Sequence, residues 1–197
     1  MKRIGLFMFA VVAIALMFSG NALAQGDNSY YFVTYYANNV SGAPDGTVRI
    51  INDGDTGEGL YAFIFVFDDS QELQECGACW ITPDGLLSED VKTELTSNTL
   101  TGRVPSRGVI KVISYAVDFA GITASDPPAP GLRAFATHIQ SSNNTNKGAT
   151  NSTTETPFAD SNLTAGEFDQ LVNLCEYALD LGSGQGSISC TLEDHDF

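Results

Sequence analysis

The sequence is poor in basic residues and in histidine. Only 9 of its 197 residues are Lys or Arg, against 24 Asp or Glu, so the formal net charge is −15. A field of that sign repels nucleic acids and anionic lipid headgroups, which disfavours both as partners. The two histidines are His138 and His195, and no serine lies in a G-x-S-x-G nucleophile elbow. Hydrolase chemistry therefore has little support, and we expect no catalytic role for His138.

Long apolar segments are also absent beyond the N-terminus. There, two basic residues precede a nearly unbroken apolar stretch over 4–18, and Ala22-Leu23-Ala24 forms an A-x-A cleavage site. The stretch is shorter than the roughly 20 residues that a membrane-spanning helix needs. The sequence therefore predicts a cleavable export signal at 1–24 and one β-rich domain at 25–197. We expect the mature chain to be periplasmic or extracellular and to have no membrane span.

Only four cysteines are present, Cys76, Cys79, Cys175 and Cys190. In an oxidising compartment, a small even number of cysteines in a domain of this size indicates two disulfides. A bond between Cys76 and Cys79 would close a very small loop and stabilise the fold little. We therefore favour the two pairings that join this segment to Cys175 and Cys190, and the sequence does not choose between them.

The Cys76-Gly77-Ala78-Cys79 motif has two other interpretations. It could be the dithiol of a thiol-disulfide oxidoreductase, but acidic residues precede it and no βαβ unit surrounds it. Four thiolates could also bind zinc, yet the second pair of cysteines does not form another C-x-x-C. We expect no cofactor and keep the oxidoreductase as the alternative function.

Runs of alternating, β-branched and aromatic residues dominate the first two thirds of the chain. They predict strands at 30–37, 47–52, 60–68, 108–117 and 132–140, with weaker candidates at 80–82 and 187–192. The run 61–67 is apolar at both its odd-numbered and its even-numbered positions, so we expect it to be covered on both faces. Glycine- and proline-containing turns separate the runs, which favours an antiparallel β-sandwich of about six to seven strands.

One α-helix is predicted near the C-terminus. Residues 164–167 match a capping box, Thr-x-x-Glu, and apolar residues then recur at helical spacing from Phe168 to Ala178. Leu181 and Gly182 end the predicted helix. This stripe places Cys175 on the buried side. Before the helix, residues 141–156 are almost entirely Ser, Thr, Asn and Gly, which predicts a mobile surface loop.

Two groups of residues are weak candidates for binding. Asp53, Asp55 and Glu58 alternate through a glycine-containing turn, as calcium ligands often do, but the EF-hand pattern fails and a solvated turn is favoured. Tyr30, Tyr36 and Trp80 could supply an exposed aromatic platform. Their ligand would be an envelope or extracellular protein or glycan that the sequence does not name.

A further set of segments is informative when taken together: 35–50, 63–67, Cys79 with 82–86, 100–102, 108–112, 131–138 and 181–186. In these segments the chain resembles a group of uncharacterised secreted bacterial proteins. These are structural signatures rather than catalytic motifs, so the resemblance implies export and cysteine placement only. Tyr61 stands where some members have a further cysteine. Because no complete catalytic set is present, we expect a secreted, non-catalytic binding or structural component of the cell envelope or extracellular matrix.

Overall fold

The computed structural model describes residues 29–37, 44–118, 122, 126–144 and 148–190. The predicted export signal and His195 lie outside these ranges. Within them the chain forms nine strands and one helix: β1 Tyr31–Ala37, β2 Thr47–Asn52, β3 Leu60–Asp68, β4 Leu73–Ile81, β5 Leu86–Asp90, β6 Arg107–Tyr115, β7 Leu132–Asn144, β8 Gly148–Pro157, β9 Ala159–Asp160 and α2 Ala165–Asp180. No helix among the described residues is both long enough and apolar enough to cross a membrane.

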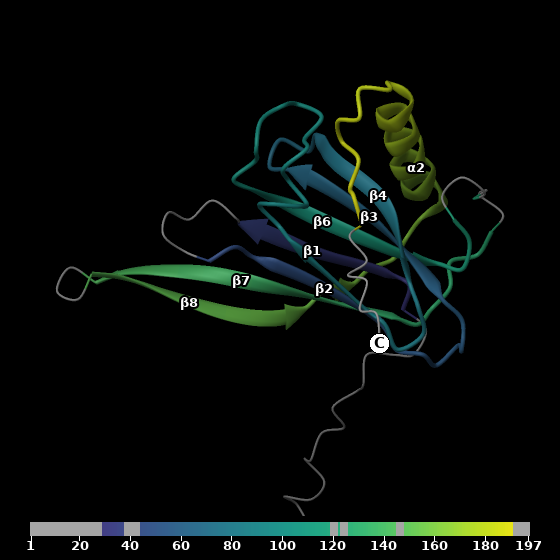
Figure 1. Ribbon diagram of the computed structural model, residues 1–197, viewed down its shortest axis with the longest axis horizontal. Helices are drawn as coiled ribbons and strands as arrows, with labels where there is room; N and C mark the ends of the chain where they lie inside the picture. The colour runs from purple at the N-terminus through teal and green to yellow at the C-terminus, as the bar shows by residue number, and fades with distance from the viewer. Residues whose placement is uncertain (1–28, 38–43, 119–121, 123–125, 145–147, 191–197) are drawn as a thin grey trace, which may run out of the picture.

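The strands form two antiparallel sheets (Figure 1). Sheet A has the order β4-β3-β6-β1-β9, and sheet B has the order β5-β2-β7-β8. The predicted antiparallel sandwich with a C-terminal helix is confirmed, although it has more strands than the six to seven expected.

The strand β3 shows how the layers are held together. Its residues Ala62, Ile64 and Val66 belong to the core between the two sheets, whereas Phe63 and Phe65 belong to a second core between sheet A and α2. Because successive side chains of a strand point to opposite faces, a strand apolar at both parities can serve two cores. Sheet A is therefore the central layer of the molecule, with sheet B on one face and α2 on the other.

The segment 141–156 corrects one sequence prediction. Its described residues are strand rather than loop: β7 continues to Asn144, and β8 pairs with it from Gly148↔Asn144 to Pro157↔Phe135. The two strands form an arm that projects beyond the rest of sheet B (Figure 1). The segment is rich in threonine, which is β-branched and favours strands, and its pairing with β7 overrides the loop-like composition.

The cysteine motif lies in a strand that the sequence only partly predicts. The weak candidate at 80–82 overlaps only the last two residues of β4, the strand that carries the whole motif, and β5 and β9 are not predicted at all. At the C-terminal end, Ser187 forms only an isolated parallel bridge with Cys76. Residues 188–190 form no strand, and residues 191–192 of this weak candidate lie outside the described residues.

Candidate functional site

The Cys76-Gly77-Ala78-Cys79 motif joins β4 to two different C-terminal segments. Disulfides link Cys76 to Cys175 on α2 and Cys79 to Cys190 beyond the helix, which is one of the two favoured pairings. Residues three apart on a strand face opposite sides. Accordingly, Cys76 lies in the core beneath α2, and Cys79 lies in the core between the sheets.

This geometry bears on the redox and zinc interpretations. Both Cys76 and Cys79 are fully buried. A vicinal dithiol, like a four-thiolate metal site, needs its sulfur atoms on one face, and β4 does not offer that arrangement. Gly77 has a packing role instead: a Cβ atom there would lie 3.0 Å from Cβ of Ile188 and 3.2 Å from its carbonyl oxygen. The motif therefore holds the C-terminal segments against the sheet.

The three aromatic candidates do not form one platform. Tyr36 is only 4% exposed, and its hydroxyl donates a hydrogen bond to the Phe67 carbonyl, so its proposed binding role is corrected to a core role. Trp80 is 36% exposed and packs edge to face against Tyr61. Tyr30 is half-buried beside the start of β1, which β3 and β6 separate from β4 in sheet A.

His138 is buried and stacks against an exposed tyrosine. The rings of His138 and Tyr35 are 4.3 Å apart between their centroids. Burial lowers the pKa of His138. A neutral imidazole packed against an aromatic ring fits a structural role for this residue.

Asp53 and Glu58, two of the calcium candidates, take part in an ion pair and in hydrogen bonds of the turn. Asp53 Oδ2 lies 3.0 Å from Arg133 Nη2, and Asp53 Oδ1 accepts a hydrogen bond from the Asp55 backbone. The Glu58 carbonyl accepts a hydrogen bond from the Asn52 side chain. Within the described ranges, no three His, Cys, Asp or Glu side chains gather closely enough to hold a metal ion.

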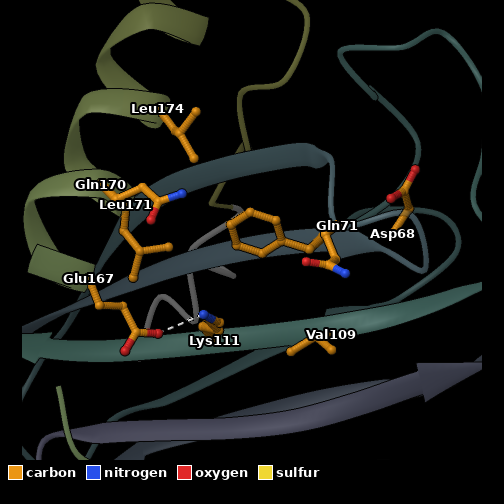
Figure 2. Close-up of a pocket in the computed structure, with 9 residues that line it drawn as sticks. Asp68, Gln71, Val109, Lys111, Glu167, Gln170, Leu171 and Leu174 are labelled. Atoms are coloured by element: carbon orange, nitrogen blue, oxygen red, sulfur yellow. Dashed lines mark hydrogen bonds and ion pairs between the residues drawn. The ribbon is translucent and has the colours of Figure 1, made fainter. Parts of the chain in front are cut away.

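A cleft of about 430 Å³ lies between α2 and the outer face of sheet A. Figure 2 shows it with α2 on one side and the strands of sheet A on the other. Its lining residues are Phe67, Asp68, Gln71, Val109, Lys111, Glu167, Gln170, Leu171 and Leu174. The volume falls within the range of small-molecule sites, which are usually mostly apolar with a few converging polar groups. This cleft is the strongest candidate functional site.

The polar end of the cleft is built around Glu167. Its Oε1 atom accepts hydrogen bonds from Lys111 Nζ at 2.7 Å and from the Tyr31 hydroxyl at 2.5 Å. Burial alone would raise the pKa of Glu167, but these two donors outweigh it and hold that pKa below its usual value. Burial, followed by the bond to Glu167, raises the pKa of Tyr31. Glu167 is therefore held as a carboxylate by donors from two strands.

The opposite end of the cleft is set by the turn between β3 and β4. Asp68 accepts hydrogen bonds from the backbones of Ser70 and Glu72 and from the Gln74 side chain. Gln71 adopts a left-handed backbone with φ of 68°, which is uncommon for a residue other than glycine. Figure 2 shows Asp68 and Gln71 away from the Lys111–Glu167 pair. The cleft thus has two polar ends, and Phe67, Leu171 and Leu174 add apolar surface to its lining.

Two fully buried carboxyl groups lie outside the cleft. Glu75 Oε1 accepts a hydrogen bond from the Asn98 backbone, and burial raises the pKa of Glu75 to about 7. Neither oxygen of Glu89 accepts a hydrogen bond from the described residues. Burial, and then the neighbouring carboxyl groups of Glu94 and Asp90, raise the pKa of Glu89 to about 8. Both residues point into the core between the sheets from edge strands, since they pair with Val66 and Val48.

Comparison with known proteins gives no functional assignment. No protein-family model and no curated protein matches the sequence. Among solved structures, the chain is similar to the crystal structure of Thermotoga maritima 1070, with 14% sequence identity and a TM-score of 0.43. That similarity covers 71% of this chain and 99% of the other.

Proposed function

We propose that this protein is an exported, non-catalytic binding protein of the cell envelope or extracellular space, and that its ligand occupies the cleft between α2 and sheet A. The observation that carries the proposal is the cleft itself, which combines about 430 Å³ of volume with apolar walls and a fixed ion pair. Such sites bind ligands through apolar contact and orient them through a few polar groups. Two disulfides stabilise the scaffold, as is usual for exported proteins.

The lining favours a ligand with an apolar body and a polar end. Val109 and Leu171 offer apolar surface from the sheet and the helix, and Leu174 lies at the exposed rim. Glu167 already accepts bonds from Lys111 and Tyr31, so the pair presents a fixed dipole rather than a free charge. A polar ligand group could hydrogen-bond to this pair without breaking it, because an ammonium group has three donors and a carboxylate has several acceptor positions.

The test uses 8-anilinonaphthalene-1-sulfonate, an apolar probe with one polar end, and the disulfide-bonded mature protein. We expect its fluorescence to increase on binding and this increase to fall at least tenfold in Leu174→Asp, which puts a carboxylate at the rim. Leu181→Asp is the matched control, because Leu181, the C-cap residue of α2, is also exposed but does not line the cleft. Circular dichroism would verify that both variants are folded. Equal binding by the two variants, or no binding to the wild-type protein, would contradict the proposal.

A further inference from the structure

The strand β8 is the exposed edge of sheet B. It pairs with β7 on one side, and no strand in the described part of the chain pairs with its other side. Residues 151–157 are all exposed. An open edge presents unpaired backbone N–H and C=O groups and can template pairing with another strand.

The other three edge strands are covered or short. On β4, the Cys76 backbone donates a hydrogen bond to Gly186 and accepts one from Ile188, so the C-terminal segment covers that edge. β5 has five residues and β9 has two. Covering and shortening are the usual ways of preventing edge-to-edge association. Among the described strands, β8 is therefore the long edge left without this protection.

β8 also carries little charge in a strongly acidic protein. Of its ten residues, Gly148–Pro157, only Glu155 is ionisable, and Arg49 Nη1 lies 2.7 Å from Glu155 Oε1. Charged side chains, lysine above all, commonly protect exposed edges. This strand has no such barrier beyond one carboxylate that is already paired.

The hydrogen-bond pattern shows which backbone groups face outward. The Phe158 backbone N–H donates a hydrogen bond to the Ala134 carbonyl. The even-numbered residues of β8 therefore direct their backbone N–H and C=O groups towards β7. The odd-numbered residues, including Thr153 and Glu155, then direct their backbone N–H and C=O groups away from β7. Pro157 is also odd-numbered. The N–H group that proline lacks would point away from β7, so its absence removes no hydrogen bond between β7 and β8.

The outer half of the arm also lacks a third strand. β2 pairs with β7 only as far as Ala136, whereas Thr153 lies opposite Ile139. Beyond Ala136, β7 and β8 are hydrogen-bonded only to each other within the described residues, although His138 of β7 still stacks on Tyr35 of β1. Figure 1 shows the far part of the arm standing away from the other strands. Two-stranded ribbons are only marginally stable in water, so an additional strand would stabilise the arm.

From these observations we propose that β8 pairs with β8 of a second copy of this chain, antiparallel and centred on Thr153. This register places Ser152 opposite Thr154 and Glu155 opposite Asn151, so no like charges face each other. The two Glu155 residues lie four residues apart along the strands, roughly 14 Å at 3.4 Å per residue. That separation exceeds the Debye length of about 8 Å at physiological salt. The two B sheets thereby become one eight-stranded sheet.

The dimer is weak and depends on ionic strength. Edge pairing buries little surface compared with stable protein interfaces. Each chain carries a large negative charge, so repulsion between the copies opposes association. Added salt screens this repulsion, and the dimer fraction therefore rises from low to physiological ionic strength.

The test is sedimentation equilibrium of the mature, disulfide-bonded chain over a range of protein concentrations. We expect the wild type to show a reversible monomer–dimer equilibrium. Thr153→Lys and Thr153→Glu each place like charges directly opposite each other at the centre of the contact, so each variant associates about fivefold more weakly. An equimolar mixture of the two variants restores dimers, because opposite charges then face each other.

Thr93→Lys is the matched control, since Thr93 is exposed and lies outside β8, and it leaves the dimer unchanged. Circular dichroism verifies that all variants are folded. Three results would each overturn the proposal: a wild-type chain that stays monomeric at every soluble concentration, a dimer that both Thr153 variants leave intact, or a mixture that fails to restore it.

Discussion

Glu167 follows its local prediction in the backbone and departs from it in the side chain. The capping box predicts that its side chain turns back to the start of the helix. The first half of that box forms, because Thr164 Oγ accepts a hydrogen bond from the Glu167 backbone. The Glu167 carboxylate instead reaches Lys111 and Tyr31 in sheet A. Sequence reasoning located the helix start but not this contact, whose partners are 56 and 136 residues away.

The buried carboxyl groups of Glu75 and Glu89 were not predicted either. In the sequence, both lie among acidic and polar neighbours that are typical of a solvated surface. Their burial arises because each occupies an inward position of an edge strand, and the register of that strand is fixed by its apolar neighbours. Identifying these two buried residues requires the register in which β4 pairs with β3 and β5 pairs with β2.

These two residues predict stability that falls as pH rises. Their folded pKa values, about 7 and about 8, lie above the ordinary value of 4.5, so folding favours the protonated forms. This contribution is complete below about pH 4.5 and is lost as pH rises through 7 and 8. We expect the free energy of unfolding to be roughly 2–5 kcal/mol lower at pH 9 than at pH 5. Urea unfolding without reductant measures it.

The variant Glu89→Gln separates this effect from general repulsion among the acidic residues. Because the amide stays neutral, we expect the decrease between pH 5 and pH 9 to become smaller than in the wild type. Glu176→Gln is the control, since it removes an exposed carboxylate from α2. If Glu89→Gln and Glu176→Gln have the same pH profile, Glu89 does not produce the loss of stability.

At the level of elements, the strands rich in apolar and β-branched residues were predicted well. β2 and β3 have the predicted bounds, and β1 and β6 begin one residue from theirs. β4 was largely missed because its glutamine, glutamate, glycine and cysteines do not alternate in polarity. β8 was missed because Ser, Thr and Asn also compose loops. In both cases the neighbouring strand supplies the order that the local sequence does not specify.

The two disulfides predict different local consequences for α2. They span 99 and 111 residues, and in the chain-entropy model each contributes about 4–5 kcal/mol. Cys76→Ala with Cys175→Ala removes the bond that holds the helix, so we expect amide exchange in α2 to accelerate much more than in β3 and β6. Hydrogen exchange followed by mass spectrometry measures this under non-reducing conditions.

Cys79→Ala with Cys190→Ala provides the matched comparison. It removes a bond of similar span from the opposite face of β4. We expect it to loosen the segment 186–190 while α2 keeps most of its protection. Equal loss of protection in α2 for both double variants would show that the helix is not held by the Cys76–Cys175 bond.

Across the whole molecule, the two sheets have different surroundings. α2 covers the outer face of sheet A and forms the cleft, whereas the arm of sheet B extends away from it (Figure 1). The sequence predicted the sandwich, the helix and a cross-link between them. It did not predict the cleft, because the cleft needs the position of α2 over β3 and β6, which depends on the choice of disulfide pairing. That pairing is therefore central to the functional proposal.

Peptide mapping without reduction, on protein exported through its own N-terminal segment, tests this pairing most directly. We predict a mature chain that begins at Gln25, no free thiol, and bonds joining Cys76 to Cys175 and Cys79 to Cys190. That result would support a scaffold in which α2 is fixed over sheet A to form a binding cleft. A bond between Cys76 and Cys79, or free thiols at both positions, would contradict the account and favour redox chemistry at the motif.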